Sequence, residues 1–376
     1  MTPDVLLFPT PAIDEGPSMD RYAGELSGAL AALSGSGQLL TIQMAPAVVG
    51  AYARRFSGHA QAGRLDRAWF RYLGYPASAR RQRARAFHIL DHGYAHLVQV
   101  LDPRRTVITC HDLIPLLAAE GALPITVPAT VARTFRWRAA HLSRARRVIA
   151  VSEATRSTIE KYTDVPAQNI SVVPQGVSSV FRPLDRPRAD IRHRLGLPAQ
   201  APVILQVATR ARYKNTPAVL HALAQLRRTH ADVILIRVGA SLFDDEARLA
   251  SRLGVEGAIR QISRVTDDAL VEWYNAADVL VFPSWWEGFG WPPLEAMACG
   301  TPVVASNVAP IAEVVADAGL LVPPDDPAAM ADAAERLLGD AALAGELRAR
   351  GLARAREFTW ARTAAATAAV YGEVLA

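Results

Sequence analysis

Two glutamates separated by a glycine-rich segment are the residues of this chain that most directly suggest chemistry. Glu287 and Glu295 are eight positions apart, and Gly288 and Gly290 lie between them. Glycines leave room for a ligand to approach the main chain closely, because they carry no side chain. The spacing lets the two carboxylates face different parts of one ligand, which lie on opposite sides of its phosphate.

The residues around these glutamates predict a strand, a loop, a short helix and another strand. Residues 279–282 form an apolar run typical of a buried strand, the helix ends at Gly300, and residues 303–305 read as the next strand. The N–H groups and the dipole of a helix N-terminus favour an anion. The segment therefore predicts a site for a phosphate-containing ligand between two carboxylates.

The stretch from Pro283 to Val303 resembles the E-x7-E signature of the retaining GT-B glycosyltransferases of family 4. In that family the first glutamate binds hydroxyls of the donor sugar and the second binds the ribose of the nucleotide. The resemblance implies these roles for Glu287 and Glu295, with Glu287 among the catalytic residues. It also implies donor binding by the residues around them: Ser284, Gly288, Phe289, Gly290 and Trp291. Two solvated surface glutamates are the alternative.

A histidine follows another buried strand. Residues 106–110 are apolar and end directly before His111 and Asp112. Ligands of open α/β sheets bind beyond the carboxyl ends of the strands, so His111 is a candidate catalytic residue whose imidazole Asp112 could orient. The segment resembles the His-Asp-x-x-P element of family 4, in which the histidine approaches the transferred sugar. His92 and His96 are less favoured candidates, and a structural histidine is the alternative.

A basic loop follows the first strand of the second half of the chain. Residues 208–215 resemble the family 4 segment in which an arginine and a lysine clamp the donor diphosphate. Lys214 aligns with the lysine, and either Arg210 or Arg212 supplies the arginine. Charge-assisted hydrogen bonds to phosphate contribute ~1.5–3 kcal/mol each and oppose the negative charge that grows on the leaving diphosphate. A solvated basic loop is the alternative.

The first strand, residues 5–8, precedes a loop with Gly16 and a helix over about 20–33. Family 4 enzymes usually have a Gly-Gly pair in this loop, which faces the distal phosphate of the donor. The resemblance implies donor binding by Gly16. No G-x-G-x-x-G occurs, which argues against a dinucleotide-binding fingerprint.

Strands alternate with helices in both halves, which predicts an α/β protein with parallel sheets covered on both faces. A length of 376 residues favours two domains. The resemblance implies the GT-B fold: two Rossmann-like doubly wound domains that face each other across a cleft. The predicted domains are 1–182, joined by a C-terminal helix 360–376 that crosses back, and 183–359. We expect a linker up to about residue 202 and helical structure over 326–357.

The expected co-substrate is a nucleotide-diphosphate-sugar, and no metal or other cofactor is expected. No Asp-x-Asp occurs, whereas metal-dependent GT-A enzymes use such carboxylates to hold a divalent ion. The resemblance implies a glycan, a lipid-linked sugar or a small molecule as the acceptor. Similar His-Asp-Leu-Ile-Pro elements occur in mannosyl- and rhamnosyltransferases of surface polysaccharide assembly, which favours a hexose such as mannose.

Composition bounds the location and the partners. Only Lys161 and Lys214 of the 41 basic residues are lysines, which together with abundant alanine suggests GC-rich coding and not nucleic-acid binding. Cys110 and Cys299 are expected to be buried free thiols in a reducing compartment. No signal peptide or membrane-spanning run is visible, so we expect a cytoplasmic protein. Arginines and aromatics crowd residues 51–87, a pattern that fits a surface near an anionic acceptor or peripheral membrane contact or, alternatively, a solvated helix face.

Two other functions fit the same fold. A nucleotide-sugar epimerase or hydrolase would need an acid and a base near the sugar, and no clear second carboxylate is present for it. A non-catalytic nucleotide-sugar-binding protein would not need His111, Lys214, Glu287 and Glu295 together. Fold alone does not separate these functions.

Overall fold

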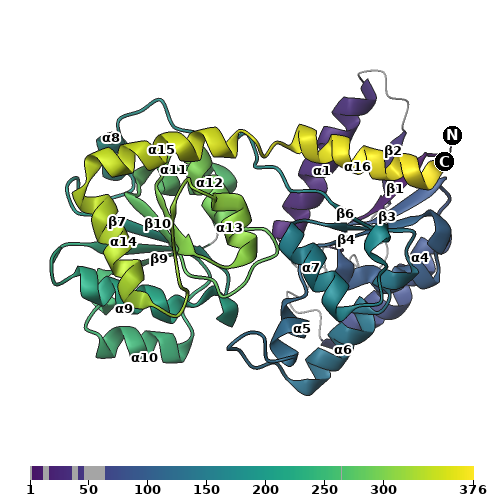
Figure 1. Cartoon of the computed structure of the whole chain (residues 1–376), viewed down its shortest axis with the longest axis horizontal. Helices are drawn as coiled ribbons and strands as arrows, with labels where there is room; N and C mark the ends of the chain where they lie inside the picture. Colours follow the sequence, from purple (N-terminus) through teal and green to yellow (C-terminus); the bar gives the residue numbers. More distant parts are fainter. Residues whose placement is uncertain (1, 12–16, 36–40, 46–63, 264) are drawn as a thin grey trace. The chain divides into compact units, whose positions relative to one another are not determined.

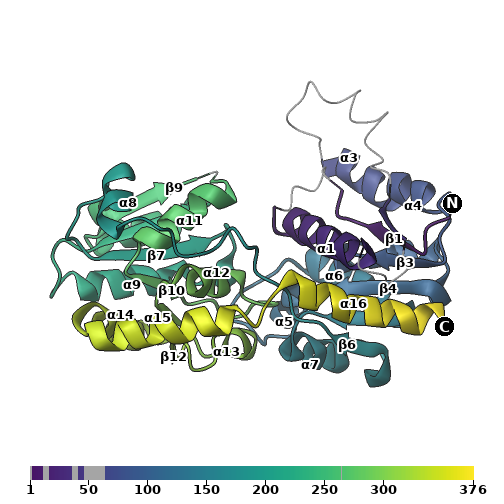
Figure 2. The ribbon, with the colours of Figure 1, turned by 90° about the horizontal axis from the view of Figure 1, so that it is seen from above.

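The chain forms two compact units in the computed structural model, which describes all residues except 1, 12–16, 36–40, 46–63 and 264 (Figures 1 and 2). The N-terminal unit consists of Met1–Ala119, Val127–Gly176 and Thr359–Ala376. The C-terminal unit consists of Glu120–Thr126 and Val177–Phe358. The C-terminal helix therefore belongs to the N-terminal unit. The predicted domain boundary between residues 182 and 183 stays a prediction.

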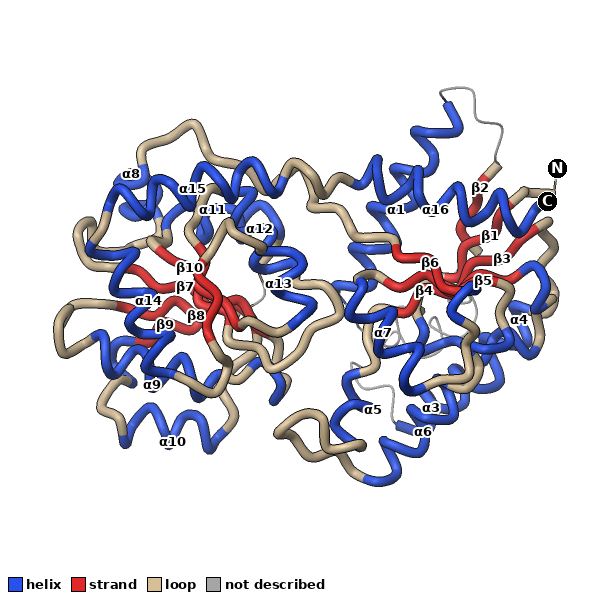
Figure 3. Tube along the Cα trace, viewed as in Figure 1, coloured by secondary structure: helices blue, strands red, loops and turns tan. Residues whose placement is uncertain are grey.

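A parallel six-stranded sheet organises the N-terminal unit, in the order β2-β1-β3-β4-β5-β6 (Figure 3). Its strands are β1 (Val5–Phe8), β2 (Ile42–Met44), β3 (Ala86–Ile89), β4 (Thr106–Cys110), β5 (Arg147–Ala150) and β6 (Ile170–Val172). β1, β3 and β4 are buried along their whole length, as expected of parallel strands covered on both faces. β2 pairs with one edge of β1 and β3 pairs with the other edge, so the winding of the sheet reverses between β1 and β3.

Helices flank this sheet. They are α1 (Pro17–Gly35), α3 (Arg64–Trp69), α4 (Tyr75–Ala79), α5 (Ile114–Ala119), α6 (Ala129–Ala139), α7 (Glu153–Tyr162) and α16 (Trp360–Leu375). The last helix, α16, lies along α1, although these two helices are at opposite ends of the sequence (Figures 1 and 2). Ser152 caps α7 by accepting a hydrogen bond from the backbone N–H of Thr155, as a serine before a helix commonly does.

A second parallel six-stranded sheet organises the C-terminal unit, in the order β12-β11-β10-β7-β8-β9. Its strands are β7 (Val203–Ala208), β8 (Ile234–Gly239), β9 (Ile259–Ile262), β10 (Val279–Phe282), β11 (Val303–Ser306) and β12 (Leu320–Val322). β8 pairs with one edge of β7 and β10 pairs with the other edge. The winding of this sheet therefore reverses between β7 and β10.

Eight α-helices are described in the C-terminal unit. They are α8 (Arg188–Arg194), α9 (Thr216–Leu226), α10 (Asp244–Arg252), α11 (Asp267–Ala276), α12 (Trp291–Cys299), α13 (Ala309–Val315), α14 (Pro327–Gly339) and α15 (Ala341–Ala355). Thr266 caps α11 and Asp326 caps α14 through their side-chain oxygens. Two sheets of this kind with flanking helices confirm the predicted α/β class and its two Rossmann-like domains.

The structure corrects two predicted elements of the C-terminal unit. Helical structure over 326–357 is two helices, because Asp340 is extended and its carboxylate accepts the first N–H groups of α15. The predicted linker contains α8, which packs on α11. Arg192 of α8 is buried and donates to Asp278 at 2.6 Å and to the carbonyl oxygen of Ala276 at 3.0 Å. A Pro- and Arg-rich composition did not indicate this packing.

Both cysteines are buried free thiols, as predicted. Cys110 ends β4 and Cys299 ends α12. Burial raises the pKa of each thiol, so neither is a reactive thiolate near neutral pH. Within the described residues, no helix has both the length and the apolar character needed to cross a membrane.

Candidate active site

Two loops of the C-terminal unit meet where its sheet reverses its winding. One loop follows β7 and holds Arg210, Arg212 and Lys214, and the other follows β10 and holds Ser284 and Glu287. β7 and β10 are neighbours, so both loops leave the same edge of the sheet side by side. Open α/β sheets bind ligands at such a reversal, outside the carboxyl ends of the strands.

Lys214 and Glu287 form a buried ion pair between these loops. Nζ of Lys214 donates to Oε1 of Glu287 at 2.7 Å, and each side chain is 10% exposed. The ammonium group also lies 5.3 Å from the ring centroid of Phe282. An ammonium group can donate several hydrogen bonds, so Lys214 can bind an anion while it still holds Glu287. The ammonium group of Lys214 can bind a phosphate, and the adjacent carboxylate of Glu287 can accept hydrogen bonds from hydroxyl groups. The pair therefore suits a ligand that carries both.

Hydrogen bonds to backbone carbonyl groups fix the two loops to each other. Asn215 has a left-handed conformation with φ of 51°, and its side-chain amide donates to the carbonyl oxygens of Pro283 at 3.2 Å and Pro324 at 2.8 Å. The backbone N–H of Trp285 donates to the carbonyl oxygen of Tyr213 at 2.8 Å. These bonds hold the residues on either side of Lys214 and the loop before Glu287 in one arrangement. Sequence reasoning did not identify this role of Asn215.

The two candidate arginines differ in their surroundings. Arg212 makes a bidentate ion pair with Asp245, with distances of 2.8 and 3.0 Å, and it stacks on the ring of Phe243. Arg210 is exposed and lies over the same ring at 4.7 Å. Among the described residues, no carboxylate pairs with Arg210. Arg210 is therefore the arginine whose charge is not already neutralised by a neighbouring side chain.

The loop that carries Glu287 ends at the N-terminus of α12. Gly290 caps this helix with φ of 116°, a conformation that favours glycine. Pro292 and Pro293 follow Trp291 and have no N–H, so backbone donors at this helix end come from Trp291 and the residues before it. The helix dipole still favours an anion at this end.

Glu295 lies one turn further along α12 and is buried. The hydroxyl group of Tyr274, in α11, donates to its Oε2 at 2.7 Å. Glu295 therefore has a fixed position in a different environment from that of Glu287. No local sequence pattern indicates Tyr274 as its partner, because the two residues are on separate helices.

The other predicted donor-binding residues vary in their access to a ligand. Ser284 is fully buried, and its carbonyl oxygen accepts from the hydroxyl of Ser306 at 2.5 Å. Phe289 is buried against Phe358, with 5.7 Å between the ring centroids. Gly288 and Trp291 are partly exposed in the loop. Gly16 lies outside the described residues. The donor-binding roles of all these residues stay predictions.

In the N-terminal unit, His111 lies at the carboxyl end of β4 and is held by the protein at both ring nitrogens. Nε2 lies 2.8 Å from the carbonyl oxygen of Leu90, and Nδ1 lies 2.9 Å from Nε2 of Gln175. The prediction that Asp112 orients the imidazole is wrong. Asp112 instead accepts the backbone N–H of Ile114 at the start of α5. Gln175, to which the sequence suggested no role, is the side chain that contacts His111.

A buried chain of hydrogen bonds connects α16 with β3, β4 and α1 of the N-terminal unit. The hydroxyl of Tyr371 lies 2.6 Å from Nδ1 of His88, and Nε2 of His88 lies 2.8 Å from the hydroxyl of Thr109. Thr109 in turn lies 3.2 Å from the hydroxyl of Tyr22, whose ring packs edge-on against His111. Burial lowers the pKa of His88 to about 3, so its ring is neutral.

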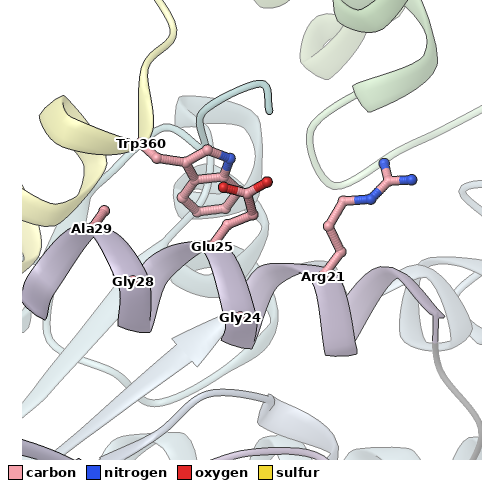
Figure 4. A pocket seen from close by; sticks show the side chains of 6 residues that line it. All are labelled: Arg21, Gly24, Glu25, Gly28, Ala29 and Trp360. Atoms are coloured by element: carbon pink, nitrogen blue, oxygen red, sulfur yellow. The ribbon is translucent and has the colours of Figure 1, made fainter. Parts of the chain in front are cut away.

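A pocket of about 490 Å³ opens on α1 beside the first residue of α16. It is lined by Arg21, Gly24, Glu25, Gly28, Ala29 and Trp360. Figure 4 shows Arg21 and Glu25 on the side of α1 that faces Trp360. None of the predicted site residues that the structure describes lines it. Elsewhere in the described residues, no group of three His, Cys, Asp or Glu side chains is arranged to hold a metal ion.

Two glycosyltransferase family profiles match the chain. Residues 20–181 match the profile "Glycosyltransferase Family 4", and residues 187–358 match "Glycosyl transferases group 1". The two matches together span most of the chain and correspond to its two Rossmann-like domains. The chain belongs to the GT-B glycosyltransferases, and this confirms the resemblance predicted from residues 283–303.

Similar curated proteins carry glycosyltransferase names. The chain is 32% identical over 270 residues to the serotype-specific mannosyltransferase WbdA of Escherichia coli, an alignment that covers 70% of this chain and 32% of WbdA. It is 38% identical over 242 residues to a D-inositol 3-phosphate glycosyltransferase of Streptomyces bingchenggensis, covering 61% of this chain and 53% of that protein. The alignments thus span a third to a half of the length of these relatives.

Solved structures share the fold along the whole chain. Sucrose-phosphate synthase from Thermosynechococcus elongatus superposes with a TM-score of 0.78 at 24% identity, covering 99% of both chains. Anabaena HepE, solved in complex with UDP and glucose, gives a TM-score of 0.73 at 19% identity and covers 99% of this chain and all of that one. These likenesses establish the fold.

Proposed function

We propose that the protein is a retaining glycosyltransferase that moves a hexosyl group from a nucleotide-diphosphate-sugar to a hydroxyl group of an acceptor. The observation that carries this proposal is the buried Lys214–Glu287 pair at the reversal point of the second sheet. One member can neutralise a diphosphate while the other accepts hydrogen bonds from sugar hydroxyls. An ion pair without a function would typically be exposed to solvent. This pair is buried, and hydrogen bonds of Asn215 and Trp285 hold the loops that carry it.

Each residue has a distinct role in the proposed reaction. Lys214 and Arg210 bind the diphosphate and stabilise the charge that develops when its bond to the sugar breaks. Glu287 binds the sugar and orients it, and Glu295 binds the ribose. The acceptor hydroxyl attacks the anomeric carbon from the face that the diphosphate leaves, and its proton passes to the departing phosphate oxygen. The products are the glycoside, with retained configuration, and the nucleoside diphosphate.

We propose that this reaction requires no metal ion. A divalent cation in a glycosyltransferase offsets the negative charge of the diphosphate. In this chain Lys214 and Arg210 follow β7, and α12 begins after the neighbouring strand β10, so we propose that these groups supply the positive potential in place of a metal ion. Lys214 is held by Glu287 before the reaction, so it needs little reorganisation when the leaving group forms.

The proposed sugar is mannose or a related hexose, and the proposed acceptor is a glycan, a lipid-linked sugar or a small molecule of surface polysaccharide or glycolipid assembly. The mannosyltransferase name of WbdA, at 32% identity, supports the choice of sugar. The name of the D-inositol 3-phosphate glycosyltransferases supports a small-molecule acceptor equally well. A cytoplasmic location is part of the proposal, because the nucleotide-sugar donor would be taken up there.

Peripheral membrane contact is part of the same proposal. Trp69, Leu73 and Trp137 expose between 43% and 58% of their surface. Trp137 contacts Tyr72, which joins α6 to the segment after α3. Exposed aromatic and aliphatic side chains beside arginines fit the interface of an anionic membrane. Arg54 and Arg55 of the predicted basic stretch at residues 51–87 lie outside the described residues.

Thermal unfolding in the presence of UDP-, GDP-, TDP- and ADP-sugars tests the proposal. A nucleotide-sugar at about 100 times its Kd should stabilise the wild type by ~2.7 kcal/mol. The Glu287→Gln variant keeps the shape of the side chain and removes its charge, and we expect it to lose the part of this shift that depends on the sugar. Equal stabilisation by every nucleotide, or by none, would contradict the proposal.

A further inference from the structure

The pocket on α1 beside the first residue of α16 has no role in the chemistry described so far. Its volume of about 490 Å³ is in the range of pockets that hold small ligands. Its lining residues, which include Arg21, Glu25 and Trp360, all belong to the N-terminal unit. The pocket is therefore a feature of that unit alone, whereas Lys214 and Glu287 belong to the other unit.

Two glycines form the floor of this pocket, although packing does not require them. Gly24 and Gly28 are four positions apart and therefore lie on one face of α1. Both are exposed, and a Cβ atom added at either position would approach no neighbouring group within 4 Å. Glycine inside a helix is less stable than a residue with a side chain. The two glycines thus leave a strip of bare helix backbone on which a flat ligand can lie.

An aromatic ring forms a wall beside this floor. Figure 4 shows the indole of Trp360 next to the turns of α1 that carry Gly24 and Gly28. The centroid of this ring lies 5.8 Å from that of Tyr22, and the Tyr22 ring packs edge-on against His111 at 4.6 Å. The wall of the pocket is therefore fixed by packing, and one ring separates it from the histidine at the carboxyl end of β4.

Two charged side chains border the pocket one helical turn apart. Arg21 and Glu25 are both partly exposed and lie on the side of α1 that faces Trp360 (Figure 4). Within the part of the chain that the structure describes, the carboxylate of Glu25 makes no hydrogen bond or ion pair. A guanidinium group donates several hydrogen bonds and a carboxylate accepts several. The two side chains can therefore bind hydroxyl groups around the edge of a ligand.

We propose that this pocket binds a sugar ring of an oligosaccharide acceptor, away from the hydroxyl group that is glycosylated. A pyranose ring has C–H groups on its faces and hydroxyl groups around its edge. One face can stack on Trp360 over the glycine floor while the hydroxyl groups bind Glu25 and Arg21. This inference rests on the proposed function and deepens it, because it selects a glycan over a small molecule as the acceptor.

Fluorine nuclear magnetic resonance of the full chain, labelled with fluorotryptophan, detects binding at this pocket. The Trp360→Phe variant identifies the Trp360 signal among those of the seven tryptophans. Mannotriose and maltotriose are the glycan probes, and D-inositol 3-phosphate is the small-molecule probe. A trisaccharide at millimolar concentration should shift the Trp360 signal and leave that of the exposed Trp137 on α6 in place. No shift with either trisaccharide, an equal shift of Trp137, or a shift with the inositol phosphate alone would overturn the proposal.

A substitution in the glycine floor fills the pocket without removing a contact. Gly28→Leu places a side chain in open space and replaces a glycine inside a helix, so it should keep or raise the melting temperature while it abolishes the trisaccharide shift of Trp360. Gly345→Leu is the matched control, because Gly345 is also exposed within a helix, α15, and an added Cβ has no neighbour within 4 Å. This control should leave the shift unchanged. A trisaccharide shift that survives in Gly28→Leu would contradict the proposal.

Glu25→Gln tests the charged edge of the pocket. It keeps the shape of the side chain and removes its charge. We expect the affinity for the trisaccharide to fall about tenfold, the range of one hydrogen bond to a charged group. Unchanged affinity would show that the carboxylate does not bind the sugar, and the proposed mode of recognition would be wrong.

Transfer assays separate the failure of this inference from the failure of the proposed function. With a nucleotide-sugar that the wild type uses, Gly28→Leu should raise KM for a trisaccharide acceptor and leave KM for the donor unchanged. Equal KM values for the trisaccharide in both proteins would contradict the inference but leave the proposed function standing. A wild type that transfers no sugar from any nucleotide-sugar would refute the proposed function, even where a trisaccharide still shifts the Trp360 signal.

Discussion

Lys214 and Glu287 depend on each other at the scale of single residues, because they share one hydrogen bond in a buried place. Removal of one partner leaves the other charge buried and unpaired, which typically costs 3–5 kcal/mol of stability, about as much as a catalytic effect. Variants that remove either residue therefore need a measurement of folding beside each measurement of activity. Charge-preserving changes such as Lys214→Arg provide a matched control.

We predict that Lys214→Met lowers kcat/KM by about a hundredfold to a thousandfold, because it removes a cation aimed at the leaving diphosphate. Arg210→Ala should also lower kcat/KM, whereas Arg212→Ala should cost less, since Arg212 already pairs with Asp245. Steady-state kinetics at temperatures where all variants are folded measure these effects. A larger loss for Arg212→Ala than for Arg210→Ala would reverse the choice of arginine.

The two glutamates should affect different steps. Glu295→Gln should weaken binding of the bare nucleoside diphosphate, because the ribose is present with or without a sugar. Glu287→Gln should leave that binding nearly unchanged and lower the rate of transfer, because its contact tightens as the anomeric carbon becomes cationic. Calorimetry and transfer kinetics of both variants measure the two effects.

Tyr274→Phe is the matched control for Glu295. It removes the hydrogen bond that the Tyr274 hydroxyl donates to Oε2 and should weaken nucleotide binding less than Glu295→Gln does. If the two glutamates were only surface residues, neither change would exceed about 0.5 kcal/mol. Weaker nucleotide binding by Glu287→Gln alone would exchange the two assignments.

The types and positions of Lys214, Glu287, Glu295 and His111 could be predicted from the sequence, because each follows or belongs to a recognisable element. Their partners could not. Gln175 is 64 positions from His111, and Glu287 is 73 positions from Lys214. Contacts of this range depend on strand order and on loop conformation, such as the left-handed Asn215, which no local pattern specifies.

At the scale of elements, α16 is attached to the N-terminal sheet through polar groups as well as through packing. Tyr371 on this helix contacts His88 on β3, and Thr363 donates to the carbonyl oxygen of Pro174 at 2.8 Å. A side chain at Gly176 would place its Cβ 2.3 Å from the backbone nitrogen of Trp360, so only glycine permits this close approach. The helix is therefore an integral part of the unit.

The buried His88 predicts a dependence of stability on pH. Its pKa falls from 6.5 to about 3 on folding, because burial disfavours the charged ring. The unfolded chain therefore binds more protons between these values, and stability is lost as the pH falls below 6.5. By about pH 5 this residue should contribute a loss of about 2 kcal/mol.

Urea unfolding at about pH 7 and about pH 5 measures this loss. His96, whose pKa burial lowers to about 4, adds to it in the same direction. The His88→Gln variant cannot take up the proton, so the difference in its stability between the two pH values should be smaller than that of the wild type. An identical difference in both proteins would show that His88 does not titrate in this way.

Most strands and helices could be predicted, because each carries its own apolar pattern or cap. β1, β4 and β10 have the predicted limits of 5–8, 106–110 and 279–282. The exceptions are elements whose existence depends on distant groups. α8 is held by Asp278 and by backbone carbonyls far along the chain, and β9 lies at an exposed sheet edge without a strong apolar run.

At the scale of the whole molecule, the two units carry different parts of the proposed chemistry. The C-terminal unit holds Lys214, Glu287 and Glu295. The N-terminal unit holds His111. The two family profiles match the two units in the same order along the chain. Membership in the GT-B glycosyltransferases determines the fold. The donor, the acceptor and the stereochemistry of the reaction depend instead on the residues of the site.

Analysis of the products tests the central claim most directly. The wild type is incubated with the nucleotide-sugar that stabilises it most, with and without an acceptor, in the presence of excess EDTA. We predict release of nucleoside diphosphate together with a glycoside of the same anomeric configuration as the donor, only when acceptor is present and despite the chelator. Free sugar or an isomerised nucleotide-sugar without acceptor, inverted configuration, or activity that returns only with added Mg²⁺ or Mn²⁺ would contradict the account.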